Sequence, residues 1–160
     1  MTTRKISALR RRGHRSMDIG TSAQSTEAVN PKTEMTHTEA KDFVRNHFEE
    51  FVNRKNLKIG EVNFAPEFVD HGTDVPSGTP PGPAGAMQYV GGAYKKFPDI
   101  QVEILDLIAE GDRVVVRNRW TGTEAATGKK VEFAGIVIWR IAHRQLAERW
   151  AYLTPPREAQ

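Results

Sequence analysis

The hydrophobic and polar positions of the chain follow two different periods, one in each half. In the first half, apolar residues recur every three or four positions, which predicts helices over residues 38–54, 57–64 and 84–96. In the second half, they recur at every other position, which predicts strands over residues 100–109, 113–123, 130–141 and 146–153. The chain is therefore expected to place its helices first and then a meander of four antiparallel strands.

The longest predicted strand, residues 130–141, is apolar on both of its faces. One face carries Val137 and Trp139 and the other carries Ile136 and Ile138, so much of this strand is expected to be covered on both sides. In the first predicted strand, the alternation changes phase at Ile104-Leu105, which indicates a β-bulge there. Such a bulge curves a sheet.

Helices gathered on one face of a curved antiparallel sheet define an α+β domain with a cone-shaped pocket on its concave side. A Gly/Pro-rich stretch, residues 72–85, is expected to form a loop at the rim of that pocket or a lid over it. Residues 67–72 before it are predicted as a short strand or an extended turn. Thr36 and Glu39 have the spacing of a capping box at the start of the first helix.

Composition adds a domain plan to this picture. The chain has 160 residues, 38% of them hydrophobic, with no cysteine and no apolar run long enough to span a membrane. Residues 36–154 are predicted to form one domain, preceded by a disordered basic tail (1–35) and followed by a short C-terminal tail (155–160), which is expected to end the fold at Pro155-Pro156. The absence of cysteine fits a cytoplasmic protein, and no membrane partner is expected.

The positive charge of the chain belongs to its first residues. Residues 1–35 hold seven of the 23 basic side chains and three of the 20 acidic ones, so the remainder has 16 basic and 17 acidic residues. A basic tail without an aromatic platform or a helix-turn-helix pattern is a weak footprint for nucleic acid. A nucleic-acid partner is therefore not favoured.

A set of short segments occurs in a fixed order across residues 38–153: Phe68–Gly72, Pro80–Gly85, Phe97–Asp99, Asp106–Arg113, Trp120–Thr123, Gly135–Ile141 and Glu148–Trp150. In this order they resemble the SnoaL-like polyketide (ester) cyclase family of the nuclear transport factor 2-like superfamily. The resemblance implies the same α+β cone, and it implies a homodimer formed through the convex face of the sheet. The fold alone leaves the reaction open, because it hosts several enzyme types and binding modules.

The resemblance also implies a mechanism, from which this sequence departs. The family's cyclases use an aspartate on the last strand as general acid/base and a polar residue on the preceding strand, without metal or cofactor. The family pattern Glu-His-Trp-Asp reads Glu148-Arg149-Trp150-Ala151 here, and the polar partner position is Val137. Alanine cannot move a proton, so the cyclase mechanism cannot be carried over unchanged.

Three polar residues are the remaining candidates for chemistry. His71 is the best surviving ionisable group and could act as a general base, or it could only tie its loop to the sheet. Asn118, a lone amide on an apolar face, could donate a hydrogen bond to a ligand or be a satisfied group in the pocket wall. Arg149 shares a strand face with Ala151, and by the resemblance it reaches the pocket and favours a carboxylate or phenolate.

The expected pocket lining is apolar, and the expected ligand is a small apolar molecule. The lining is predicted to include Phe48, Met87, Tyr94, Trp120, Phe133, Val137 and Trp139. His47, on the apolar side of the first helix, is interpreted as a core histidine, and no metal site or cofactor is predicted. Two functions stay open: a cofactor-independent cyclase, isomerase or hydrolase acting on an apolar carbonyl, lactone or ester compound, and a non-catalytic module that binds such a compound.

Overall fold

The structure of the chain is a computed structural model that describes residues 34–159. The predicted N-terminal tail, residues 1–35, lies outside the described residues, except for its last two positions. The elements are α1 (His37–His47), a π-helix η1 (Phe48–Asn53), α2 (Lys58–Asn63), β1 (Phe64–Asp70), α3 (Gly82–Lys96), β2 (Gln101–Glu110), β3 (Arg113–Thr123), β4 (Lys130–Ala142), β5 (Gln145–Leu153) and β6 (Arg157–Glu158). The α+β class predicted from the two periods is confirmed.

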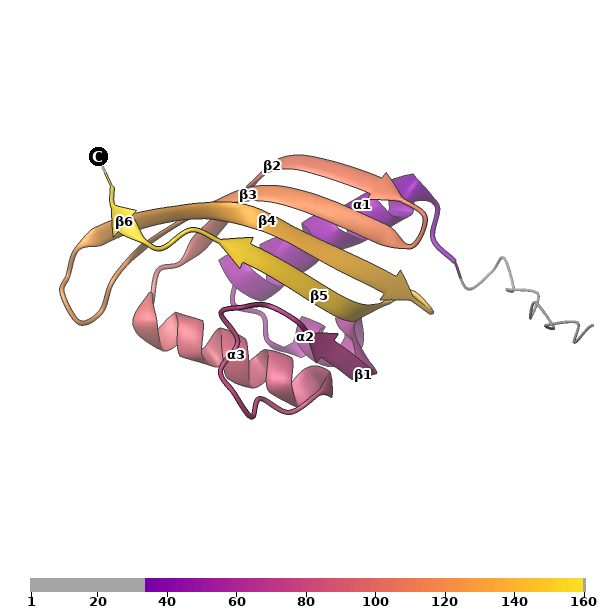
Figure 1. Ribbon diagram of the computed structural model, residues 1–160, viewed down its shortest axis with the longest axis horizontal. Helices are drawn as coiled ribbons and strands as arrows, with labels where there is room; N and C mark the ends of the chain where they lie inside the picture. Colours follow the sequence, from indigo (N-terminus) through magenta and orange to yellow (C-terminus); the bar gives the residue numbers. More distant parts are fainter. Residues whose placement is uncertain (1–33, 160) are drawn as a thin grey trace, which may run out of the picture.

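The strands form one curved sheet in the order β1-β5-β4-β3-β2 (Figure 1). The predicted antiparallel meander is present from β2 to β5. Two pairings were not expected. Strand β1 adds to the edge as a parallel neighbour of β5, and the chain continues past Pro156 into β6, which pairs with the start of β4.

The predicted bulge lies where the alternation changes phase. In the β2–β3 ladder Ile104 pairs with Asn118 and Asp106 pairs with Arg117, so Leu105 is the extra residue. An extra residue on one strand bends it and increases its twist. The bulge therefore contributes to the curvature that gives the sheet a concave face.

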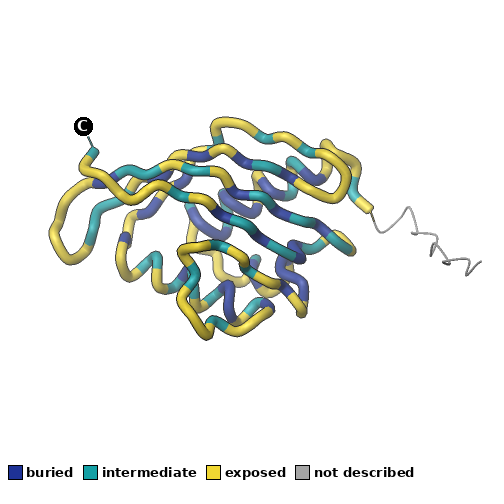
Figure 2. Tube along the Cα trace, viewed as in Figure 1, coloured by how far each residue is buried: buried dark blue, intermediate teal, exposed yellow. Residues whose placement is uncertain are grey.

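All the helices lie on that concave face (Figure 1), and the buried residues gather between them and the sheet (Figure 2). Helix α1 packs against β2, and α3 packs against β1. Helix α1 begins with the predicted capping box, in which Thr36 and Glu39 each bond the other's backbone N–H. In α3, Pro83 occupies the first turn, where its missing N–H is not needed.

The first predicted helix is one continuous segment that changes type at Phe48. Its last turn is the π-helix η1, and Asn53 at its end pairs with the edge strand β2 like a neighbouring strand. The Asn53 Nδ2 donates to the Val102 carbonyl at 3.1 Å, and the Val102 N–H donates to Asn53 Oδ1 at 2.8 Å. Apolar spacing did not distinguish the two helix types, since both keep Phe48 and Phe51 buried.

Strand β4 is covered on one face only, which corrects the prediction that much of it is covered on both. Val137 and Trp139 face the helices and are 1% and 3% exposed, whereas Ile136 on the opposite face is 44% exposed. The physical reason is that the helices all pack on the concave side. The convex side of β4 has no described element above it.

Candidate functional site

A cavity of about 480 Å³ lies between the concave face of the sheet and the helices. Most of its wall is aromatic. The aromatic lining residues are Phe48, Phe51, Phe64, Phe68, Tyr89, Tyr94, Phe97, Trp120, Phe133 and Trp139, with His47 among them. Trp120 and Phe133 stack with an interplanar angle of 1° and ring centroids 5.8 Å apart. The pocket therefore offers a flat apolar surface to a ligand.

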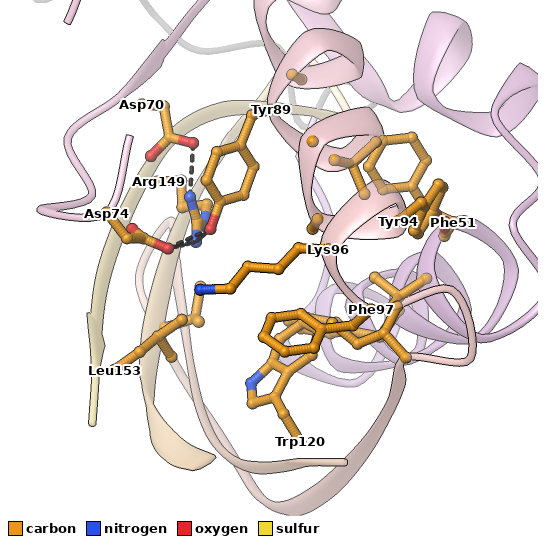
Figure 3. A pocket seen from close by; sticks show the side chains of 18 of the residues that line it. Phe51, Asp70, Asp74, Tyr89, Tyr94, Lys96, Phe97, Trp120, Arg149 and Leu153 are labelled. Carbon is orange, nitrogen blue, oxygen red and sulfur yellow. Dashed lines mark hydrogen bonds and ion pairs between the residues drawn. The ribbon is translucent and has the colours of Figure 1, made fainter. Parts of the chain in front are cut away.

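Charged lining residues cluster at one end of this cavity around Arg149 (Figure 3). Arg149 is 6% exposed. Its Nη1 donates to Asp70 Oδ2 at 2.6 Å, and Asp70 also accepts the Gly72 N–H at 3.0 Å. Asp70 lies directly opposite Arg149 in the parallel ladder between β1 and β5. Strand pairing thus fixes the ion pair between these two residues.

The other guanidinium nitrogen of Arg149 faces two groups from different elements. Its Nη2 donates to the Tyr89 hydroxyl oxygen at 3.3 Å and lies 3.6 Å from Asp74 Oδ2. The Tyr89 hydroxyl in turn donates to the same Asp74 oxygen. Tyr89 comes from α3, and Asp74 comes from the loop after β1 (Figure 3). The Tyr89 hydroxyl therefore donates to an Asp74 oxygen that also forms an ion pair with Arg149 Nη2.

Burial and charge keep both donors protonated. Burial raises the pKa of Tyr89 to about 12, so its hydroxyl stays neutral and able to donate. For Arg149, burial opposes the charged form, but Tyr89 and the carboxylates of Asp70 and Asp74 outweigh burial and raise the pKa. Both groups keep their protons near pH 7.

His47, the last residue of α1, is a pocket residue held in its neutral form. It is 1% exposed, and its ring stacks on Phe51 at 5.0 Å between centroids. Burial, with a smaller contribution from the charge of Arg149, lowers the pKa of His47 to about 3. Its Nδ1 lies 3.2 Å from Asn63 Nδ2, which donates to it in the tautomer with the proton on Nε2. It is buried among core residues, as predicted, and also lines the cavity.

Most of the predicted ligand-contacting residues line this cavity. They are Phe48, Tyr94, Trp120, Phe133, Val137, Trp139 and Arg149. Val137 is the direct cross-strand partner of Ala151, and each is 1% exposed. The two positions at which the resemblance implies polar residues are therefore neighbours, and both are apolar.

His71 does not line the cavity. Its Nε2 lies 2.7 Å from Glu148 Oε2, its ring stacks on Trp150 at 4.8 Å, and its side chain is 38% exposed. Glu148 also accepts from Arg140 at 2.6 Å, and the hydrogen bonds from His71 and Arg140 lower the pKa of Glu148. The orienting carboxylate of His71 is therefore Glu148, not Asp70, and a role of His71 as base stays a prediction.

Asn118 and Met87 also lie outside the cavity lining. Asn118 is 0% exposed, and its Oδ1 accepts the Trp120 indole N–H at 2.9 Å, while its Nδ2 has no partner in the described part of the chain. It thus orients a lining residue and has no surface in the pocket. Met87 packs against the hydrophobic core from the side of α3.

The polar lining residues Asp70, Tyr89 and Asp74 were among those not identified from the sequence as pocket residues. Asp70 follows the buried Phe68 by two positions on β1, so the two side chains point to the same face of the strand. This alternation could have identified Asp70 as a pocket residue. Tyr89 lies one turn after Ala86, which is buried on the inner side of α3. Asp74 lies in a loop without periodicity, and no sequence signal could have brought it to Arg149.

An α+β cone with a curved sheet around an apolar pocket is the architecture of the nuclear transport factor 2-like proteins. A family model described as SnoaL-like polyketide cyclase matches residues 42–154. The chain belongs to this family, as the sequence segments predicted.

Solved structures show the same fold. A candidate polyketide cyclase from Bacillus cereus is 28% identical, with 78% of this chain and 80% of that chain covered and a TM-score of 0.63. AclR, a candidate hydroxylase from Streptomyces galilaeus, is 25% identical, with 74% and 81% covered and a TM-score of 0.63. A SnoaL-like polyketide cyclase from Agrobacterium tumefaciens is 15% identical, with 76% and 93% covered and a TM-score of 0.61. A comparison with the curated proteins found no match.

Residues 34–159 contain no cluster of three or more histidine and acidic side chains arranged to hold a metal ion. No helix in this part of the chain is long and apolar enough to cross a membrane.

Proposed function

We propose that the chain is a cofactor-independent enzyme of the cyclase, isomerase or hydrolase type, acting on a small apolar carbonyl, lactone or ester compound. One observation carries this proposal. At the charged end of an otherwise aromatic cavity, Arg149 Nη2 and the Tyr89 hydroxyl both face a single oxygen atom, that of Asp74. Two donors facing one oxygen, one of them the buried Arg149, can stabilise negative charge that develops on a substrate oxygen.

The proposed step is a proton transfer next to a carbonyl. The carbonyl oxygen of the substrate lies at the point where the Arg149 and Tyr89 donors meet. The Asp74 carboxylate takes a proton from the neighbouring carbon, and the C–H electron pair becomes an enolate whose oxygen faces both donors. Every catalytic group in this step is a side chain of the protein. His71, with Glu148 as its partner, is the competing proton acceptor.

The identity of positions 137 and 151 supports this reassignment. The resemblance implies a catalytic aspartate at the position of Ala151, and neither Ala151 nor its neighbour Val137 can exchange a proton. We therefore assign the carboxylate function to Asp74, which reaches the pocket from the loop. The same apolar pair favours the second candidate function, a non-catalytic module that binds an apolar molecule.

A panel of esters, lactones and β-dicarbonyl compounds tests the proposal. We expect the wild-type chain to turn over at least one of them and Asp74→Asn to lose at least about 100-fold in kcat, because general base catalysis is worth about 10²–10⁴-fold. His71→Ala is the matched control and should retain activity. If His71→Ala alone abolishes turnover, His71 is the base. Ligand protection without turnover in the whole panel supports the binding module.

The convex face supports a further proposal, that the chain forms a homodimer. Ile136 and Tyr152 are 44% and 60% exposed on neighbouring strands of this face. Burial of such apolar groups favours association. Light scattering coupled to size-exclusion chromatography should give twice the chain mass, and a monomer at all concentrations would contradict the proposal.

A further inference from the structure

Resting on the proposed function, we infer that the Arg149–Tyr89 pair is an oxyanion-binding site which Asp74 of the chain itself occupies, and that a ligand with a flat apolar body and an anionic oxygen displaces Asp74. The anionic oxygen is that of a carboxylate or of an enolate. Asp74 thereby blocks the site when no ligand is bound. Ligand binding releases the Asp74 carboxylate from the Arg149–Tyr89 pair.

The two carboxylates near Arg149 are held differently. Asp70 lies on a strand, bonds Arg149 Nη1 at 2.6 Å, and its side chain is 10% exposed. Asp74 lies on a loop, is 3.6 Å from Arg149 Nη2, and its side chain is 29% exposed. Asp70 therefore neutralises the buried guanidinium permanently. Asp74 adds a second negative charge that the ion pair does not require.

The loop that carries Asp74 has few other ties to the domain. Within residues 73–79 the backbone hydrogen bonds are local, from Val75 to Gly72 and from Thr79 to Pro76, both at 3.2 Å. In the described part of the chain, the side-chain bonds that join these residues to another element run through Asp74. Gly78 adopts a positive φ of 82°, which glycine accommodates without strain. Release of Asp74 thus leaves the loop free to move.

Charge and shape define the class of ligand. An anionic ligand oxygen in the place of Asp74 keeps two negative groups around Arg149, so the balance of charge is unchanged. Lys96 also lines the pocket (Figure 3), with its Nζ 5.2 Å from the centroid of the Phe97 ring, and its ammonium group adds attraction for an anion. The stacked rings of Trp120 and Phe133 line the same pocket and offer a flat surface for a ring system.

Three naphthalene probes test the inference: 2-naphthoate, which carries a carboxylate, 2-acetonaphthone, which carries a neutral carbonyl that can become an enolate, and 2-methylnaphthalene, which has no oxygen. Affinities are measured by fluorescence titration on the full chain at pH 7. We expect Asp74→Ala to tighten 2-naphthoate binding about tenfold, because the site no longer bonds its internal carboxylate. Binding of 2-methylnaphthalene should stay within about twofold.

A matched control removes a carboxylate elsewhere. Asp106 pairs with Arg117 at 2.5 Å on the convex face, so Asp106→Ala changes the net charge equally without touching the pocket. Its 2-naphthoate affinity should equal that of the wild type. In a Tyr89→Phe background, which lacks one donor, the gain from Asp74→Ala should shrink to about threefold or less.

The outcomes separate this inference from the proposed function. Equal tightening in Asp74→Ala and Asp106→Ala would show a net-charge effect and overturn the inference. Equal tightening of 2-methylnaphthalene would show that only space was created, and failure of 2-naphthoate to bind Asp74→Ala would also overturn it. If Asp74→Ala binds both 2-acetonaphthone and 2-naphthoate more tightly than the wild type does, the site also accepts the oxygen of an enolisable carbonyl. Turnover of the ester, lactone and dicarbonyl panel is a separate measurement, so either result can fail alone.

Discussion

The two faces of the sheet carry similar charge networks in different surroundings. On the concave face, Arg149 pairs with Asp70, and their side chains are 8% and 10% exposed. On the convex face, Arg140 pairs with Glu148, and their side chains are 30% and 26% exposed. The partners on β5 are adjacent residues, and alternation along the strand sends one inward and the other outward.

This difference teaches that burial, rather than the type of partner, decides what an arginine–carboxylate pair can do. Water screens the convex pair and weakens it. The concave pair lies away from water, where an unpaired charge is costly and hydrogen bonds to a developing charge are strong. The site for ligand chemistry is therefore expected on the concave face, although His71, the candidate base, belongs to the convex network.

The largest expected effect is that of breaking the buried pair. Arg149→Met leaves Asp70 buried without its partner, so we expect the free energy of unfolding to fall by about 3–5 kcal/mol. Urea unfolding followed by circular dichroism measures this loss. The double variant with Asp70→Asn should recover part of it. A loss below about 1 kcal/mol would mean that water already screens the pair.

The next largest effect is the dependence of folding stability on pH that His47 causes. Its folded pKa of about 3 lies below the unfolded value of 6.5, so the unfolded chain takes up the proton first as the pH falls. The contribution of His47 to stability is fully present above pH 6.5 and is lost toward pH 3. Between pH 6.5 and pH 4.5, we expect a loss of about 2–3 kcal/mol.

Urea unfolding across this pH range tests the prediction, with His47→Gln as the variant that keeps an amide near Asn63. The variant should show a flatter dependence of stability on pH from 6.5 to 4.5, the window above the ordinary pKa of carboxylates. Identical slopes for the wild type and His47→Gln would contradict the neutral, buried state of this ring.

The smallest expected effect comes from the convex network. Glu148→Gln weakens the contacts of the Glu148 carboxylate with Arg140 and with His71, yet it should cost at most about 1 kcal/mol, because exposed pairs are weak. Added salt should diminish this cost and leave that of Arg149→Met nearly unchanged. A larger cost for Glu148→Gln than for Arg149→Met would reverse the comparison of the two faces.

Local patterns in the sequence predicted most of the fold. The change of phase at Leu105 determined the bulge, and Thr36 and Glu39 determined the start of α1, since each depends on residues close together in the chain. The parallel pairing of β1 with β5 was missed because it joins Asp70 to Arg149, which are far apart in sequence. Alternation along a strand does not reveal which strand lies beside it.

The candidate site was predictable only in part for the same reason. Val137 was found because its position on a strand fixes the face toward which it points, and Arg149 was found because it shares a strand face with Ala151, a position that the family resemblance places in the pocket. Asp74 was missed because a Gly/Pro-rich loop has no periodicity, and its contact with Tyr89 exists only after the sheet and α3 are assembled. His71 was selected for its chemistry, but its side chain lies outside the lining of the pocket.

The carbonyl ¹³C chemical shift of bound 2-acetonaphthone, labelled at its carbonyl carbon, tests the central claim most directly. This shift moves downfield when the carbonyl oxygen accepts hydrogen bonds, so it reports which donors hold the oxygen. We expect the same downfield shift in the wild type and in His71→Ala, and a smaller one in Tyr89→Phe. A shift that persists in Tyr89→Phe and disappears in His71→Ala would contradict the assignment of the site to the concave face.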